Sequence, residues 1–66
     1  MLVNVNGSET EIPAGCTVSG LLQIKNLSAA KVVVELNGEI VKSGQWEDTV
    51  LAAEDRVEII RFVGGG

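Results

Sequence analysis

Histidine is absent from this chain of 66 residues, and cysteine occurs once, at Cys16. A single thiol cannot form an intramolecular disulfide, and without imidazoles or further thiolates it cannot build a zinc site. Cys16 has no imidazole base and lies in the turn-like segment Pro13-Ala14-Gly15-Cys16, so we interpret it as structural and not as the nucleophile of a thiol enzyme. These absences argue against a disulfide or a zinc site within the chain and against a thiol enzyme.

Positive charge and long apolar runs are also scarce. Five lysines and arginines stand against nine carboxylates, and the resulting net charge of −4 opposes binding to a phosphate backbone. Apolar runs such as Val32-Val33-Val34 are too short to cross a bilayer, and no basic, apolar leader precedes the strand-like pattern that starts at Met1. We therefore expect a soluble, cytoplasmic monomer that binds neither nucleic acid nor membrane. Its carboxylates either keep it soluble or face basic protein surfaces.

Two Asn-Gly pairs predict two β-hairpins. Residues 1–6 alternate between apolar and polar side chains, as in a strand with one buried face. Asn6-Gly7 favours the positive φ angles of a type I′ turn, so residues 8–12 should return antiparallel and bury Ile12. Asn37-Gly38 predicts the same turn between strands at 31–36 and 39–42.

A short helix is predicted between the hairpins. Thr17 suits the N-cap, and the stripe of Val18, Leu21 and Leu22 gives one apolar face. Gly20 lies inside the helix at a cost of about 1 kcal/mol relative to alanine, and Asn26 offers a left-handed exit. Later in the chain, a helical turn is possible near Trp46, which we interpret as a lid over one edge of the core and not as a ligand platform.

The last predicted strand spans residues 56–63. Its alternation places Val57 and Ile59 on one face and Ile60 and Phe62 on the other. Ile60 and Phe62 either form an exposed docking patch or are covered by an adjacent loop. The residues do not decide between these two possibilities.

The chain then ends in Val63-Gly64-Gly65-Gly66. Glycines without side chains add nothing to a core and lose the most entropy on ordering, so folding alone does not explain them. They suit a segment that carries a carboxylate into the narrow site of a partner, although a frayed end is the simpler explanation for an arbitrary glycine-rich terminus. We expect a domain at 1–62 and a flexible tail at 63–66.

The order hairpin, helix, hairpin, loop and strand predicts an α+β fold. A right-handed crossover would place the first and last strands side by side and parallel, with the helix packed across one face of a mixed sheet. This is the β-grasp, or ubiquitin-like, topology with a glycine tail.

On these residues the chain resembles the ThiS-type family, the sulfur carriers of thiamin biosynthesis. The resemblance runs end to end and includes the following motifs: Asn6-Gly7, Pro13-x-Gly15-x-Thr17-Val18-x-x-Leu21-Leu22, Asn37-Gly38-Glu39-Ile40-Val41, Trp46, and Asp55-Arg56-Val57-Glu58-Ile59 running into Val63-Gly64-Gly65-Gly66. Gly20 and the short helix depart from the usual longer helix of the family. Glu54 stands where the family commonly has glycine.

The resemblance implies that the chain is a protein substrate and not an enzyme, with no catalytic residue and no metal ligand of its own. An E1-like enzyme would use ATP to adenylate the carboxylate of Gly66, and sulfur from a persulfide donor would convert it to a thiocarboxylate that supplies thiazole synthase. Val63, Gly64 and Gly65 would give clearance in the partners' sites. The chain itself would bind no cofactor. Two alternatives stay open, namely a carrier for another pathway such as the small subunit of molybdopterin synthase, and a β-grasp binding module that carries no sulfur.

Overall fold

The computed structural model describes residues 1–27 and 31–62. In this part of the chain the elements are β1 (Leu2–Val5), β2 (Ser8–Glu11), α1 (Val18–Ile24), β3 (Val32–Leu36), β4 (Glu39–Val41), the 3₁₀ helix η1 (Ser43–Gln45) and β5 (Arg56–Arg61). The order and type of the predicted elements are confirmed. The predicted tail, residues 63–66, lies outside the described residues, so the division of the chain at Val63 stays a prediction.

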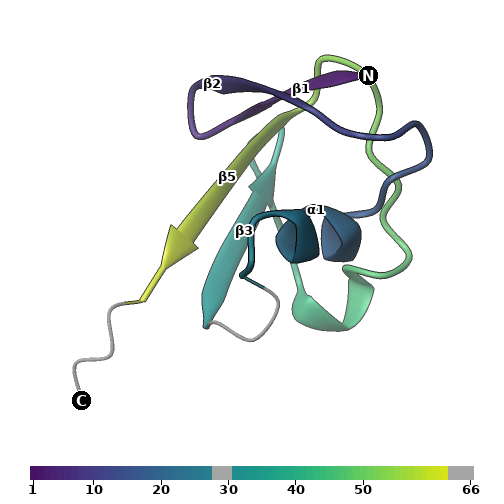
Figure 1. Ribbon diagram of the computed structural model, residues 1–66. Helices are drawn as coiled ribbons and strands as arrows, with labels where there is room; N and C mark the ends of the chain where they lie inside the picture. Colours follow the sequence, from purple (N-terminus) through teal and green to yellow (C-terminus); the bar gives the residue numbers. More distant parts are fainter. Residues whose placement is uncertain (28–30, 63–66) are drawn as a thin grey trace.

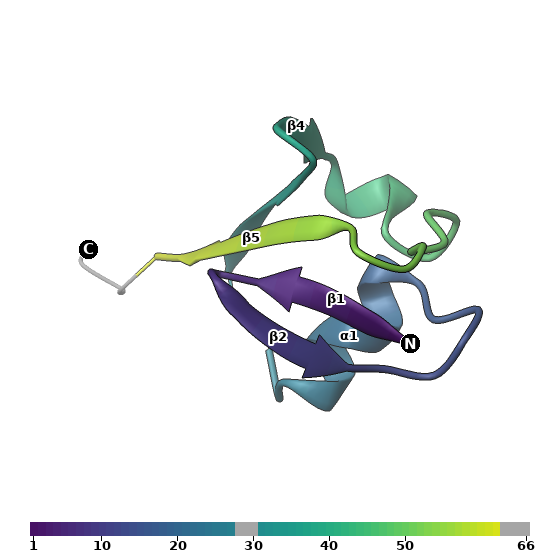
Figure 2. The ribbon, with the colours of Figure 1, turned by 90° about the horizontal axis from the view of Figure 1, so that it is seen from above.

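The strands form one mixed sheet of order β2-β1-β5-β3-β4 in the described residues. β1 and β5 pair in parallel, whereas the other neighbouring strands pair antiparallel. Figures 1 and 2 show β5 running through the middle of this sheet, between the two hairpins. The structure therefore confirms the predicted mixed sheet with adjacent, parallel first and last strands.

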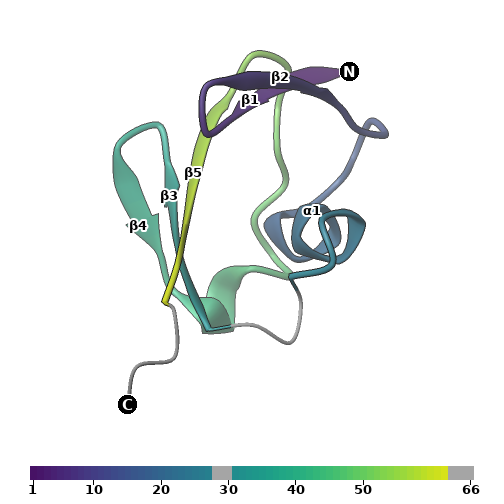
Figure 3. The same ribbon diagram turned by 60° about the vertical axis from the view of Figure 1, so that its left-hand side comes forward.

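Helix α1 covers one face of the sheet, as predicted. Figure 3 shows the helix on one side of β3 and β5. The buried core between them is Val3, Val5, Ile12, Val18, Leu21, Leu22, Val32, Val34, Leu51, Val57 and Ile59. The helix has seven residues, and none of the helices in the described residues is long and apolar enough to span a membrane.

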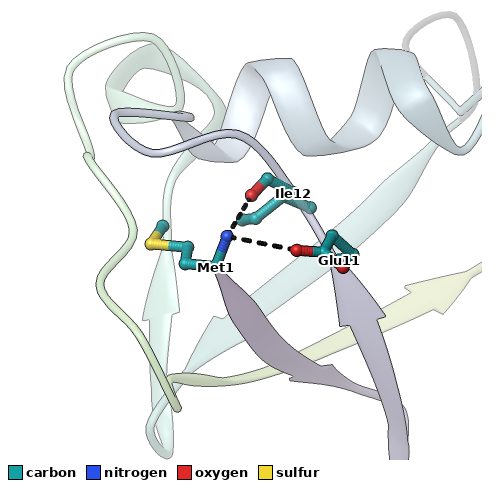
Figure 4. A network of polar contacts seen from close by, with 3 residues as sticks. All are labelled: Met1, Glu11 and Ile12. Atoms are coloured by element: carbon teal, nitrogen blue, oxygen red, sulfur yellow. Dashed lines mark hydrogen bonds and ion pairs between the residues drawn. The ribbon is translucent and has the colours of Figure 1, made fainter.

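Both Asn-Gly turns take the predicted backbone conformation. The φ angles are 51° and 86° at Asn6 and Gly7, and 51° and 90° at Asn37 and Gly38. Positive φ at both central residues gives the turn a twist that matches the twist of the flanking strands. At the open end of the first hairpin, the Met1 amino group donates to the Ile12 carbonyl at 2.7 Å (Figure 4). The Ile12 amide in turn donates to the Met1 carbonyl at 2.9 Å. The Met1 amino group also lies 3.7 Å from a Glu11 carboxylate oxygen.

The two ends of α1 are fixed by the residues that the sequence indicated. The Thr17 hydroxyl accepts a 3.0 Å hydrogen bond from the Gly20 amide, which caps the first turn. Asn26 leaves the helix with φ of 60°, and the Leu27 amide donates to the Leu22 carbonyl at 2.7 Å. Leu27 then packs, half-buried, against the core.

The segment between β4 and β5 closes the remaining edge of the core. Trp46 is half-buried against the core, and its indole Nε1 donates to the Val41 carbonyl at 2.9 Å. This agrees with its interpretation as a lid. A single antiparallel bridge between Thr17 and Val50 ties the segment to the start of the helix, so that Leu51 enters the core.

Candidate functional site

The candidate site is the sheet face opposite α1, together with the end of β5. We call this surface the open face and define it by the side chains that alternate outward along β3, β4, β5 and the residue that follows β5, namely Val33, Glu35, Ile40, Arg56, Glu58, Ile60 and Phe62. Their strand neighbours Val34, Val57 and Ile59 are buried under the helix, which fixes the direction of the outward residues because successive side chains in a strand point to opposite faces.

Ile60 and Phe62 are exposed, with 46% and 58% of their surfaces accessible. The alternative that an adjacent loop covers them is wrong for the described residues. Ile60 lies directly opposite the half-buried Val33 on β3, and Ile40 on β4 is 67% exposed. Four apolar side chains, those of Val33, Ile40, Ile60 and Phe62, thus share the open face, although folding gains little from exposed apolar surface.

Asn6 holds the neighbouring part of β5. Its side-chain oxygen accepts a 2.8 Å hydrogen bond from the Ile59 amide, and its side-chain nitrogen donates to the Ile59 carbonyl at 3.2 Å. The amide group therefore acts as one further backbone unit of β1 and extends the parallel pairing by one step. Sequence reasoning assigned Asn6 to the turn alone and missed this second role.

Asn37 makes a similar connection on the other side of β5. Its side-chain oxygen accepts from the Arg56 amide at 2.9 Å, and its side-chain nitrogen donates to Asp55 at 3.1 Å. The two turns thereby hold the last strand from both sides, at its start and near its middle. At the end, the Phe62 amide donates to the Lys31 carbonyl at 3.1 Å. Hydrogen bonds thus anchor β5 and also Phe62, the last described residue, which follows the strand.

The residues predicted to react or to enter a partner, Gly66 with Val63, Gly64 and Gly65, lie outside the described residues. Cys16 is half-buried, packs against the core and lies with Sγ 3.4 Å from the Thr17 carbonyl oxygen. This position suits the structural role assigned to it. In residues 1–27 and 31–62, no three cysteine or acidic side chains are grouped so that they could hold a metal ion.

The fold and the anchored last strand define a β-grasp protein of the ubiquitin-like class. A model of the ThiS family matches residues 2–66. The chain belongs to this family, whose members are small sulfur carriers of thiamine biosynthesis and not enzymes. This agrees with the resemblance seen in the sequence.

Individual relatives point the same way. A crystal structure of a thiamine biosynthesis protein (ThiS) from Geobacter metallireducens is 33% identical, superposes with a TM-score of 0.84 and is covered, like this chain, over its whole length. The sulfur carrier protein ThiS of Bacillus subtilis is 38% identical over 76% of each chain. A thiazole synthase of Magnetococcus marinus is 36% identical over this whole chain, which spans only 20% of that protein's length.

Proposed function

We propose that this chain carries sulfur for the thiazole ring of thiamin as a thiocarboxylate formed at Gly66. The observation that carries the proposal is the family match, which continues from the folded domain through the glycines to Gly66. Glycine suits these positions because a backbone without side chains passes through a narrow channel. The anchored β5 supports the proposal further, since it gives the segment that follows Phe62 a fixed point of departure.

The chemistry requires activation by a partner. A carboxylate is a resonance-stabilised anion that resists nucleophiles, so an E1-like enzyme would join the Gly66 carboxylate to the α-phosphate of ATP and release pyrophosphate. A persulfide sulfur of the donor would then attack the acyl carbon and displace AMP, which leaves an acyl disulfide. A thiol would attack the sulfur of this disulfide that is bonded to the donor protein. The thiocarboxylate would then depart with the other sulfur, and the attacking thiol would form a new disulfide with the donor.

The chain's own contribution is presentation. It would bind no cofactor, because the adenylating enzyme would hold the ATP. We place the reaction in the cytoplasm. Ile60 and Phe62 would lie against the partners while the residues from Val63 onward enter their sites. An apolar patch of this kind is what a partner buries at the centre of an interface.

Thiazole synthase is the proposed recipient of the sulfur. A segment that is 36% identical to this whole chain forms part of the Magnetococcus marinus thiazole synthase, and a second such protein, from Paramagnetospirillum magneticum, matches equally well. A carrier-like segment within the same polypeptide as a thiazole synthase supports the proposal that this chain, as a separate protein, binds a thiazole synthase.

Intact-mass spectrometry tests the proposal. Incubation with ATP, a matching adenylating enzyme and a persulfide donor should replace one oxygen of the chain with sulfur, and fragmentation should locate the change at Gly66. A variant without Gly65 and Gly66 should keep its cooperative unfolding transition and remain unmodified, because both residues follow the predicted domain at 1–62. An unchanged mass of the full chain with partners of proven activity would contradict the proposal.

Genetic complementation tests the pathway separately. The gene should rescue a thiamin auxotroph that lacks its own carrier and should fail to rescue a strain that lacks the small subunit of molybdopterin synthase. The opposite pattern would assign the chain to the other pathway.

A further inference from the structure

Two glutamates face each other on the open face. Glu35 of β3 and Glu58 of β5 are direct partners in the antiparallel register. Residues opposite each other on one face of such a pair have Cβ atoms about 4.5–5.5 Å apart, and like charges placed there destabilise the sheet. Val34, Val57 and Ile59, their buried neighbours, show that both carboxylates leave the core and point to the same side.

No basic group of the described residues lies within ion-pair distance of this glutamate pair. Neither carboxylate lies within 4.0 Å of a lysine, an arginine or the amino terminus, since the ion pair found in this part of the chain joins Met1 to Glu11. Arg56 lines the same shallow hollow as Glu35 and Glu58, together with Asn37 and Gly38, but it forms no ion pair with them. The hollow therefore carries two carboxylates and one guanidinium, which leaves an excess of negative charge.

The glutamate pair borders the apolar part of the open face. Ile60 follows Glu58 by two residues on β5, and Ile40 lies directly opposite Glu35 on β4. Burial of apolar surface supplies most of the affinity of an interface, whereas charge complementarity sets its register and raises its association rate. A repulsive pair beside such a patch is unfavourable for the isolated fold and favourable for a partner that supplies positive charge.

We infer that Glu35 and Glu58 together form a receptor for one arginine or lysine of the partner that covers Ile60 and Phe62. A guanidinium or ammonium group between the two carboxylates would remove their repulsion and gain two charge-assisted contacts. This inference rests on the proposed function, because it assigns partner chemistry to the same docking surface. The partner is a folded protein with an apolar patch next to a basic side chain.

The test compares stability with binding for Glu58→Gln, Glu58→Lys and the control Glu47→Gln. Glu47 is an exposed carboxylate in the loop after η1, outside the strands of the open face, so Glu47→Gln changes the net charge by the same amount as Glu58→Gln. Affinity for the adenylating enzyme and for thiazole synthase is measured at low and high salt, and the melting temperature is measured for each free variant.

Glu58→Gln should raise the melting temperature and weaken binding to at least one of the two proteins by about fivefold, mainly through slower association at low salt. Glu58→Lys should raise the melting temperature further, since the introduced ammonium group would attract the carboxylate of Glu35, and weaken binding more than Glu58→Gln. Glu47→Gln should alter neither binding curve by more than about twofold, as is usual for a charge outside the interface.

Equal binding of the wild type, Glu58→Gln and Glu58→Lys to both proteins, with normal formation of the thiocarboxylate, would overturn this inference and leave the proposed function intact. A drop in binding that Glu47→Gln reproduces would also overturn it, because net charge alone would then explain the effect. A wild-type chain that binds neither protein and gains no sulfur would overturn the inference and the proposed function together.

Discussion

Glu54 has a left-handed backbone conformation, with φ of 69°. The other non-glycine residues with positive φ in the described part of the chain are the asparagines Asn6, Asn26 and Asn37, which tolerate this region better than most residues because of their short polar side chains. Glu54 is exposed, and its amide donates to the Leu2 carbonyl at 2.7 Å. Glu54 lies in the turn that leads into β5, and the left-handed conformation there is strained for a residue with a side chain. A positive φ is the conformation that glycine adopts without steric cost, which agrees with the glycine expected at this position from the resemblance.

Glu54→Gly should therefore stabilise the protein. Relief of the left-handed strain, less the additional backbone entropy that glycine loses on folding, should raise the free energy of unfolding by about 0.5–1 kcal/mol. Ala53→Gly is the control, because Ala53 is also exposed and is not among the residues with positive φ. It should lower the stability by a few tenths of a kcal/mol to about 1 kcal/mol. Urea denaturation measures both. A Glu54→Gly protein that unfolds as easily as Ala53→Gly would contradict the argument.

At the scale of the element, helix α1 contains a glycine for a reason that the sequence alone does not give. A Cβ atom at Gly20 would lie 3.1 Å from Cys16 Sγ and 3.5 Å from the Thr17 hydroxyl. The first distance is shorter than ordinary van der Waals contact. Gly20 thus leaves room for the Cys16 thiol, which packs against the core. It also leaves room for the Thr17 hydroxyl, which accepts a hydrogen bond from the Gly20 amide. Cys16 and Gly20 act as a packed pair across the first turn of the helix.

A double-mutant cycle checks this pairing. Gly20→Ala gains about 1 kcal/mol of helix propensity but must displace Cys16 Sγ, so its net effect in the wild-type background should be near zero. In a Cys16→Ala background the obstacle is gone, and Gly20→Ala should stabilise the protein by about 1 kcal/mol. The fluorescence of Trp46, the single tryptophan of the chain, can follow the urea transitions.

Gly44→Ala provides the matched control, because a Cβ atom at Gly44 of η1 meets no heavy atom within 4 Å. Its effect should be the same with and without Cys16. If Gly20→Ala also shifts stability by equal amounts in both backgrounds, the thiol is not the reason for the glycine.

The elements themselves could be predicted from local signals. Two Asn-Gly pairs, a threonine cap and period-two alternation each act within a few residues, and the structure confirms all of them. The contacts of Asn6 with Ile59 could not be predicted in this way, since they join residues 53 positions apart and depend on how far β1 extends beside β5. The repulsive register of Glu35 and Glu58 depends on the pairing of β3 with β5 and is equally invisible to local reasoning.

At the scale of the whole molecule, the sheet has two faces with different uses. One face carries α1 and the core, and the other exposes Ile40, Ile60 and Phe62 beside an acidic pair. The alternation of β5 predicted which residues share a face, but only the three-dimensional arrangement shows that the described residues leave Ile60 and Phe62 uncovered. Docking through this face would place the partner against Phe62, the last described residue, directly before the segment that is proposed to react.

Phe62→Asp should separate docking from folding. Phe62 is 58% exposed, so a charge there should change the stability by no more than about 1 kcal/mol. An aspartate at the centre of an apolar interface should weaken partner binding by at least about tenfold, in line with the loss of an aromatic anchor.

Val50→Asp is the matched control, because Val50 is 60% exposed and lies in the bridge to Thr17, away from the open face. It should leave binding unchanged. Affinity is measured by titration calorimetry and stability by thermal unfolding. If Phe62→Asp abolishes cooperative unfolding, the side chain belongs to the core. If the variant folds and binds both proposed partners as the wild type does, docking uses another surface of the domain.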